Sequence, residues 1–134
     1  MNIKWSAVVI GFVVTLVLGF ISGILYVGSE ASAVVLYWGT IGVLGGLTAG
    51  YLVGGTMTSG ALHGGLATVF GSLLLLAVAA FTTLLFAGVV PTFGVVAFGL
   101  LMLAFYAIPG VLGGAIGSWA KGRRTTEEMV GTRA

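Results

Sequence analysis

The sequence contains no cysteine, and only 6% of its 134 residues are charged. The absence of cysteine excludes disulfides, thiolate nucleophiles and cysteine-based metal or iron–sulfur sites. Five Lys or Arg and three Asp or Glu residues cannot cover the surface of a water-soluble domain, since 59% of the chain is hydrophobic and 24 residues are glycine. The composition excludes a soluble globular protein, a disordered chain and a nucleic-acid binder. It predicts an integral membrane protein in contact with the lipid bilayer.

Groups that carry chemistry are equally scarce. Residues 31–120 have no formal charge at neutral pH, and His63 is the only histidine. One imidazole without a neighbouring carboxylate or thiolate makes neither a metal site nor a catalytic pair. We therefore predict no enzymatic activity, no metal and no cofactor. Two interpretations of His63 stay open, an interfacial polar residue and a pH-sensing or ligand-binding group.

What the sequence does contain is long apolar segments. Runs of 20 or more apolar residues without alternation favour helices over barrel strands, and such runs are long enough to cross a hydrocarbon core of about 30 Å. The first run exceeds the 7–15 residues of a typical signal-peptide core, so we expect it to be retained as a helix. We predict an all-α membrane protein with a transmembrane domain over residues 1–120. Its four spans cover about 5–27, 33–55, 62–90 and 93–120, with breaks at 28–30, 56–60 and Pro91, and a basic then polar tail follows over 121–134.

The basic residues indicate the orientation of the chain. Four spans place both termini on one side of the membrane, and that side then holds every Lys and Arg residue. These are Lys4, Lys121, Arg123, Arg124 and Arg133. By the positive-inside rule, both termini are predicted to face the cytoplasm of a multi-pass cell-membrane protein.

Small residues recur at every fourth position in three of the predicted spans. Such spacing keeps small side chains on one helical face and lets helix backbones approach closely, which is how helices associate in lipid. The predicted packing positions are Gly11, Thr15, Gly19 and Gly23 in the first span, Gly42, Gly46, Gly50 and Gly54 in the second, and Gly110, Gly114 and Ser118 in the fourth. Whether these ladders pack within one chain or between chains of a homo-oligomer stays open.

An internal repeat occurs at an offset of about half the chain. The segment Gly42–Gly46, with the sequence GVLGG, recurs as Gly110–Gly114. This repeat predicts a duplicated helical hairpin whose two copies are related by an axis along the membrane normal.

Proline and hydroxyl residues also fall inside the predicted spans. Pro109 removes one backbone donor and clashes with the preceding turn, so we expect a kink near residues 105–109. The hydroxyl residues either line a water or sodium path, or bond the carbonyl four residues back or a neighbouring helix. They are Thr15, Thr48, Thr68, Ser72, Thr82 and Thr83.

The glycine pattern resembles that of a known family. Gly45-Gly46-x-x-x-Gly50-Tyr51 with Gly54-Gly55, followed by Ser59-Gly60-Ala61-x-x-Gly64, is similar to small glycine-rich four-helix membrane proteins of haloarchaea, a domain of unknown function, and similar short proteins occur in Gram-positive bacteria. Members often have an Asp where Ser59 stands here. The resemblance implies no catalytic residue, substrate or cofactor.

Two functions are consistent with these features. The first is a structural or accessory membrane protein that acts through contacts with itself, with lipids or with another membrane protein. The second is an oligomeric channel or facilitator for a small solute or ion.

Overall fold

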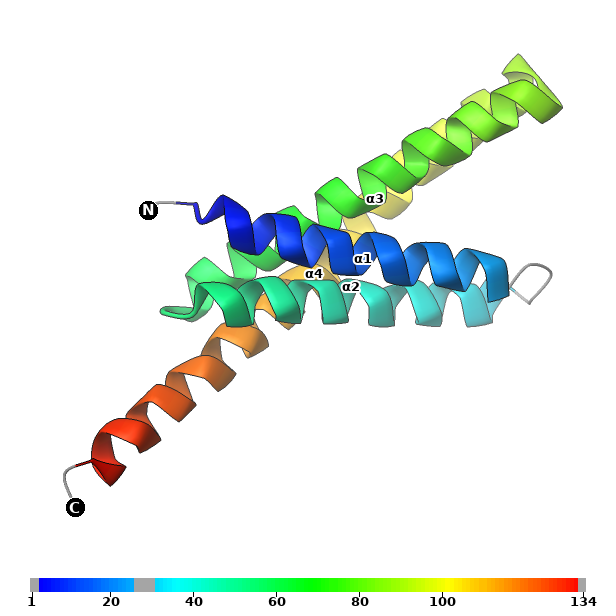
Figure 1. The fold of residues 1–134 in the computed structure, drawn as a ribbon. Helices are drawn as coiled ribbons and strands as arrows, with labels where there is room; N and C mark the ends of the chain where they lie inside the picture. The colour runs from blue at the N-terminus through cyan, green and yellow to red at the C-terminus, as the bar shows by residue number, and fades with distance from the viewer. Residues whose placement is uncertain (1–2, 26–30, 133–134) are drawn as a thin grey trace.

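The computed structural model describes the backbone of residues 3–25 and 31–132. It describes the side chains of these residues except 23, 25 and 31–38. The described residues form four helices, α1 (Trp5–Leu25), α2 (Ala31–Val53), α3 (Met57–Ala87) and α4 (Val89–Gly131) (Figure 1). A helix pairs its backbone N–H and C=O groups internally. A chain in hydrocarbon needs such pairing because no water is present to bond these groups. The prediction of an all-α chain is confirmed.

Three of these helices, α1, α3 and α4, are long and apolar enough to cross a membrane. The part of α2 with described side chains, Gly39–Val53, is a shorter apolar segment. Large apolar side chains cover the outside of the bundle, and Phe86 and Val90 are 86% and 83% exposed. Such a surface is stable in lipid and not in water, so the fold supports a membrane protein.

The core is built from small and polar residues. Val8, Ala49 and Ala67 form its apolar cluster, while the largest fully buried side chains belong to His63, Thr68, Ser22 and Ser118. A protein whose large apolar residues face outward and whose small and hydroxyl residues face inward fits a hydrocarbon environment, in which close helix packing replaces hydrophobic burial.

The four helices form two hairpins that cross one another. In Figure 1, α1 and α2 lie side by side, and the α3–α4 hairpin crosses them at an angle and diverges from them towards its turn at Gly88. We call the end of the bundle that contains this turn the Gly88 end. The opposite end, where α1 begins and α2 ends, is called the Lys4 end. Among the described residues, α2 and α3 each contact all three other helices, whereas α1 and α4 do not contact each other. A two-fold axis would make the α1–α4 contact equivalent to the α2–α3 contact, so the duplication stays a prediction.

The boundaries of α3 and α4 differ from those expected. The helix α3 begins at Met57 because the hydroxyl of Thr56 caps it and accepts a hydrogen bond from the amide of Ser59. Gly88, with φ +87°, is the single residue between α3 and α4. Pro91 does not separate the spans as predicted. It lies in the first turn of α4, where backbone amides have no acceptor within the helix, so the missing amide proton costs no hydrogen bond.

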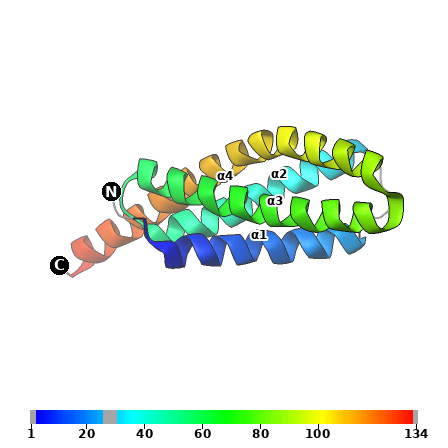
Figure 2. The ribbon, with the colours of Figure 1, turned by 90° about the horizontal axis from the view of Figure 1, so that it is seen from above.

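The basic and polar segment after Ala120 also differs from the expected form. The helix α4 continues through it to Gly131. The Thr125 and Thr126 hydroxyls donate to carbonyls three or four residues earlier, and Lys, Arg and Glu favour helix. In Figure 2 this part of α4 extends beyond the other three helices.

Candidate functional site

Helices α2 and α4 are in direct backbone contact. A methyl group added at Gly46 would overlap the carbonyl oxygen of Gly110, and one added at Gly50 would overlap that of Gly114. The two backbones therefore touch through glycine at two successive turns. The copies of the GVLGG repeat thus lie against each other in this contact.

Helix α3 packs against α4 in the same manner and meets the same two glycine carbonyls. A methyl group at Gly60 would meet the carbonyl of Gly114 and the hydroxyl of Ser118, and one at Gly64 would meet the carbonyl of Gly110. Ser118 is fully buried, and its hydroxyl donates to the carbonyl of Ala115 over 2.9 Å. Two helices thus approach α4 within one turn of its length.

Helix α1 approaches α2 and α3 through Gly11 and Thr15. An added Cβ at Gly11 would lie 2.7 Å from Ala49 Cβ and 3.0 Å from Ala67 Cβ. Thr15 packs directly on Gly45, and its hydroxyl donates to the Gly11 carbonyl over 2.9 Å. Gly19 instead faces the side chain of Leu75 of α3. Gly23 belongs to α1, but its surroundings fall outside the part that is described.

Two positions in the predicted α2 ladder differ from the central ones. Gly42 is buried, and an added Cβ would be in ordinary contact with Pro109 at 3.4 Å. Gly54 is not part of the helical ladder, because α2 finishes at Val53 and Gly54 has φ +63°. Its amide donates to the carbonyl of Gly50 over 3.0 Å, so Gly54 terminates the helix, and an added Cβ there would lie 2.9 Å from Lys121 Cδ of α4.

Sequence reasoning missed the second face of each glycine-rich helix. Methyl groups at Gly113 and Gly117 would overlap the carbonyls of Val43 and Leu47 of α2. The adjacent pairs in the sequence are the signal that could have found this face, because neighbouring residues project about 100° apart on a helix. A Gly-Gly pair therefore leaves two faces open, which a single four-residue ladder does not reveal. Such pairs are Gly45-Gly46, Gly64-Gly65 and Gly113-Gly114.

Two of the predicted topology anchors meet at the carboxyl end of α2. Lys121 Nζ donates to the Leu52 carbonyl over 3.0 Å, and Lys4 Nζ donates to the Val53 carbonyl over 3.4 Å. These carbonyls have no partner within the helix, and the negative end of the helix dipole favours ammonium groups.

The arginines that follow make different contacts. The Arg123 guanidinium lies 4.2 Å from the centre of the Trp119 ring, a cation–π contact. Arg124 is exposed on the part of α4 beyond the bundle.

His63 is fully buried at the Lys4 end and joins α1 to α3. Its Nδ1 lies 2.6 Å from the Ser59 carbonyl, and its Nε2 lies 2.9 Å from the backbone amide of Lys4. A carbonyl only accepts and an amide only donates, so Nδ1 carries the proton and Nε2 accepts. Both ring nitrogens are thus occupied by backbone groups.

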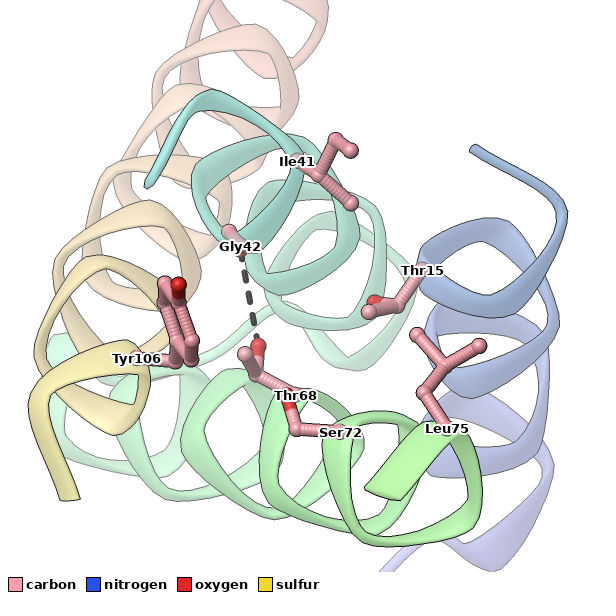
Figure 3. A pocket seen from close by; sticks show the side chains of 7 residues that line it. All are labelled: Thr15, Ile41, Gly42, Thr68, Ser72, Leu75 and Tyr106. Carbon is pink, nitrogen blue, oxygen red and sulfur yellow. Dashed lines mark hydrogen bonds between the residues drawn. The ribbon is translucent and has the colours of Figure 1, made fainter. Parts of the chain in front are cut away.

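A small cavity lies where all four helices meet. Its volume is about 10 Å³, enough for the centre of one water molecule. Figure 3 shows Thr15 pointing into it from α1, and Thr68 bridging α3 and α2. The Thr68 hydroxyl lies 2.9 Å from the Gly64 carbonyl and 3.4 Å from the Gly42 carbonyl. The walls are formed by Thr15, Ile41, Gly42, Thr68, Ser72, Leu75 and Tyr106.

A larger groove adjoins this cavity towards the Gly88 end. It lies between α3 and α4, has a volume of about 310 Å³, and shares Ser72, Leu75 and Tyr106 with the cavity. Its other walls are apolar, formed by residues such as Ala79, Phe98 and Met102. An apolar groove with a few polar groups at one end is the usual form of a small-molecule site between helices.

Towards the Lys4 end the cavity is closed. The backbone contacts of Gly46 with Gly110 and of Gly50 with Gly114 leave no space between α2 and α4 there. Helix α4 runs through Pro109 without a break in this region. The ribbon of α4 is curved in Figure 2, and a kink centred on Pro109 stays a prediction.

Comparison with known proteins identifies a family for this chain. Residues 5–120 match the model of a family of unknown function, DUF5518. No curated protein and no solved structure matches the chain. The matched segment covers the four helices up to the point where α4 leaves the bundle, and the chain therefore belongs to the DUF5518 family.

Proposed function

We propose that this chain is a four-span integral membrane protein without enzymatic activity, which acts through contacts of its helices with lipid and with a second membrane protein or another copy of itself. The observation that carries the proposal is the apolar surface near the Gly88 end. There, Phe81, Phe86 and Phe93 are each more than 60% exposed.

The length of α3 supports a role for this surface. Its 31 residues extend about 46 Å, which exceeds the hydrocarbon thickness of about 30 Å. A helix of this length tilts in the bilayer or packs against a neighbour in it. The α3–α4 hairpin diverges from α1 and α2 in Figure 1, and the exposed Phe81 and Phe86 are available to such a neighbour.

The distribution of basic residues supports an orientation in a cell membrane with both termini on the cytoplasmic side. Lys4 and Lys121 contact the same end of α2, and Arg123 and Arg124 follow within one turn. The excess of Lys and Arg at one end of the helices is typical of the cytoplasmic side. The proposal also includes kinship with the glycine-rich membrane proteins of haloarchaea and of Gram-positive bacteria.

A second candidate is an oligomeric channel or facilitator, which the hydroxyl groups of the central cavity favour. The glycine contacts of α2 and α4 close this cavity towards the Lys4 end, so a continuous path would have to form between chains. Two experiments separate the candidates.

In the first, a photoreactive amino acid replaces Phe81 or, as a control on α1, Val9, which is also exposed. One constant cross-linked protein at Phe81 and none at Val9 supports the accessory role, and lipid adducts alone at both positions contradict it. In the second, purified protein in liposomes is tested for ion and solute flux. Flux above empty liposomes supports the channel instead.

A further inference from the structure

We propose that the central cavity and the adjoining groove together bind a neutral, lipid-soluble alcohol, with its hydroxyl in the cavity and its hydrocarbon chain in the groove. The inference rests on the hydrogen-bonding state of the cavity walls, on the shared residues of the two spaces, and on the absence of charge along the spans.

The threonine hydroxyls face the cavity only as acceptors. Thr15 donates its proton to the Gly11 carbonyl, and Thr68 donates to the Gly64 carbonyl, with the Gly42 carbonyl as a longer second acceptor. Each hydroxyl oxygen retains lone pairs for an incoming donor. An occupant that carries a hydrogen-bond donor can therefore bind these oxygens, which an ether, a ketone or a hydrocarbon cannot do.

Ser72 supplies the complementary group. It lies one turn beyond Thr68 on the same face of α3 and lines both the cavity and the groove. Its hydroxyl has no hydrogen-bond partner in the described structure. Ser72 can donate to the occupant while a threonine accepts from it, and an alcohol group meets both requirements with one oxygen.

The size and position of the two spaces restrict the rest of the molecule. The cavity of about 10 Å³ holds one oxygen atom, and the groove of about 310 Å³ holds an apolar chain. No charged residue occurs between positions 31 and 120, so an ionised group would be unpaired there and costly. The cavity is closed towards the Lys4 end, and the ligand therefore enters through the groove from the lipid.

The probe for this proposal is a ten-carbon primary alcohol carrying a diazirine in mid-chain, compared with the matching alkane diazirine. Both are photolysed with the full-length protein in lipid nanodiscs, and labelled residues are mapped by peptide mass spectrometry. We expect the alcohol to label the groove residues Leu76, Ala79 and Phe98 about eightfold more than the alkane, the effect of two membrane hydrogen bonds, one donated by Ser72 and one accepted by a threonine. Equal labelling by the two probes would overturn the proposal, since hydrocarbon alone would then fill the groove.

Three variants test the geometry. Ser72→Ala should reduce the preference for the alcohol to about threefold, because the bond accepted by a threonine remains, while leaving alkane labelling unchanged. Ala79→Trp should fill the groove and prevent labelling by both probes. Val78→Trp places the same bulk on the neighbouring residue, which is 56% exposed and does not line the groove, and should behave as wild type. A preference for the alcohol that is undiminished in Ser72→Ala contradicts the proposed site.

Discussion

The backbone amide of Lys4 donates a 2.9 Å hydrogen bond to Nε2 of His63, a residue 59 positions later in the chain. The amide of Lys4 has no acceptor within α1, because it precedes the first turn. The imidazole caps the start of α1 from α3, and its other nitrogen is held by the Ser59 carbonyl. This buried side chain ties the beginning of the first hairpin to the beginning of the second.

Replacement of His63 by leucine should therefore destabilise the bundle. The substitution removes the acceptor of a partly buried amide, and we expect a loss of about 1–2 kcal/mol in the free energy of unfolding. The measurement is a titration of the protein in mild detergent with sodium dodecyl sulfate, in which circular dichroism monitors unfolding. Leu62→Ala, at an exposed neighbouring position, serves as the control and should change stability little. A variant at His63 with the stability of wild type would contradict the capping role.

The glycine contacts of α2 and α4 predict a sharp difference between two alanine substitutions. Gly46→Ala forces a methyl group against the Gly110 backbone, and we expect a loss of about 1–3 kcal/mol, the usual cost of overpacking. Gly94→Ala in α4 meets nothing within 4 Å and should be neutral or stabilising by up to about 1 kcal/mol. The same unfolding titration measures both. If Gly46→Ala unfolds no earlier than Gly94→Ala, the two backbones are not in contact.

These contacts also show how far sequence could lead. The composition and the long apolar runs predict helices, because a chain in lipid must satisfy its own backbone groups. Four-residue spacing marks Gly46 and Gly50 as small-residue positions, but it cannot tell where a helix ends, and so it included Gly54. The spacing also cannot predict which helix packs against which. Spacing gives one face of one helix, whereas the contacts of Gly113 and Gly117 depend on which helix approaches, a property of the assembled bundle.

The candidate site was less predictable than the helices. The sequence singled out Thr15, Thr68 and Ser72 as hydroxyls inside the spans, with either a path or a carbonyl bond as their role. Thr15 and Thr68 form the carbonyl bond and line a small cavity that is closed towards the Lys4 end, and a water or sodium path stays a prediction. Tyr106 was not identified, because an aromatic residue in mid-span is indistinguishable by sequence from a lipid-facing one.

The two lysines at the end of α2 predict non-additive effects. Lys121→Leu removes the ammonium that binds the Leu52 carbonyl and should cost about 0.3–1 kcal/mol, the usual effect of a cation at a helix carboxyl end. Lys4→Leu should cost a similar amount through Val53. Both ammonium groups stabilise the same helix end, so the double variant should lose more than the sum, since no cation then remains there. A double-mutant cycle measured by unfolding tests this, and strict additivity would indicate that the lysines act independently.

The proposed orientation predicts the accessibility of single cysteines, which the natural sequence lacks. Thr126→Cys lies on the exposed end of α4 and should react with a membrane-impermeant maleimide only after the cells are opened. Ser29→Cys falls outside the described residues but lies between α1 and α2 in sequence, on the opposite side of the first span, and should react in intact cells. Reaction of Thr126→Cys in intact cells would invert the orientation.

Thr68→Val tests whether the central hydroxyls stabilise the bundle. The Thr68 side chain is fully buried, and its hydroxyl lies between the carbonyls of Gly64 and Gly42, which belong to different helices. Valine preserves the shape and removes these bonds, so we expect a loss of about 0.6 kcal/mol, the average for hydrogen bonds between membrane helices. Thr82→Val removes an exposed bond within one helix, from Thr82 to the Val78 carbonyl, and should change stability much less. Equal effects at the two positions would show that the Thr68 hydroxyl contributes only within α3.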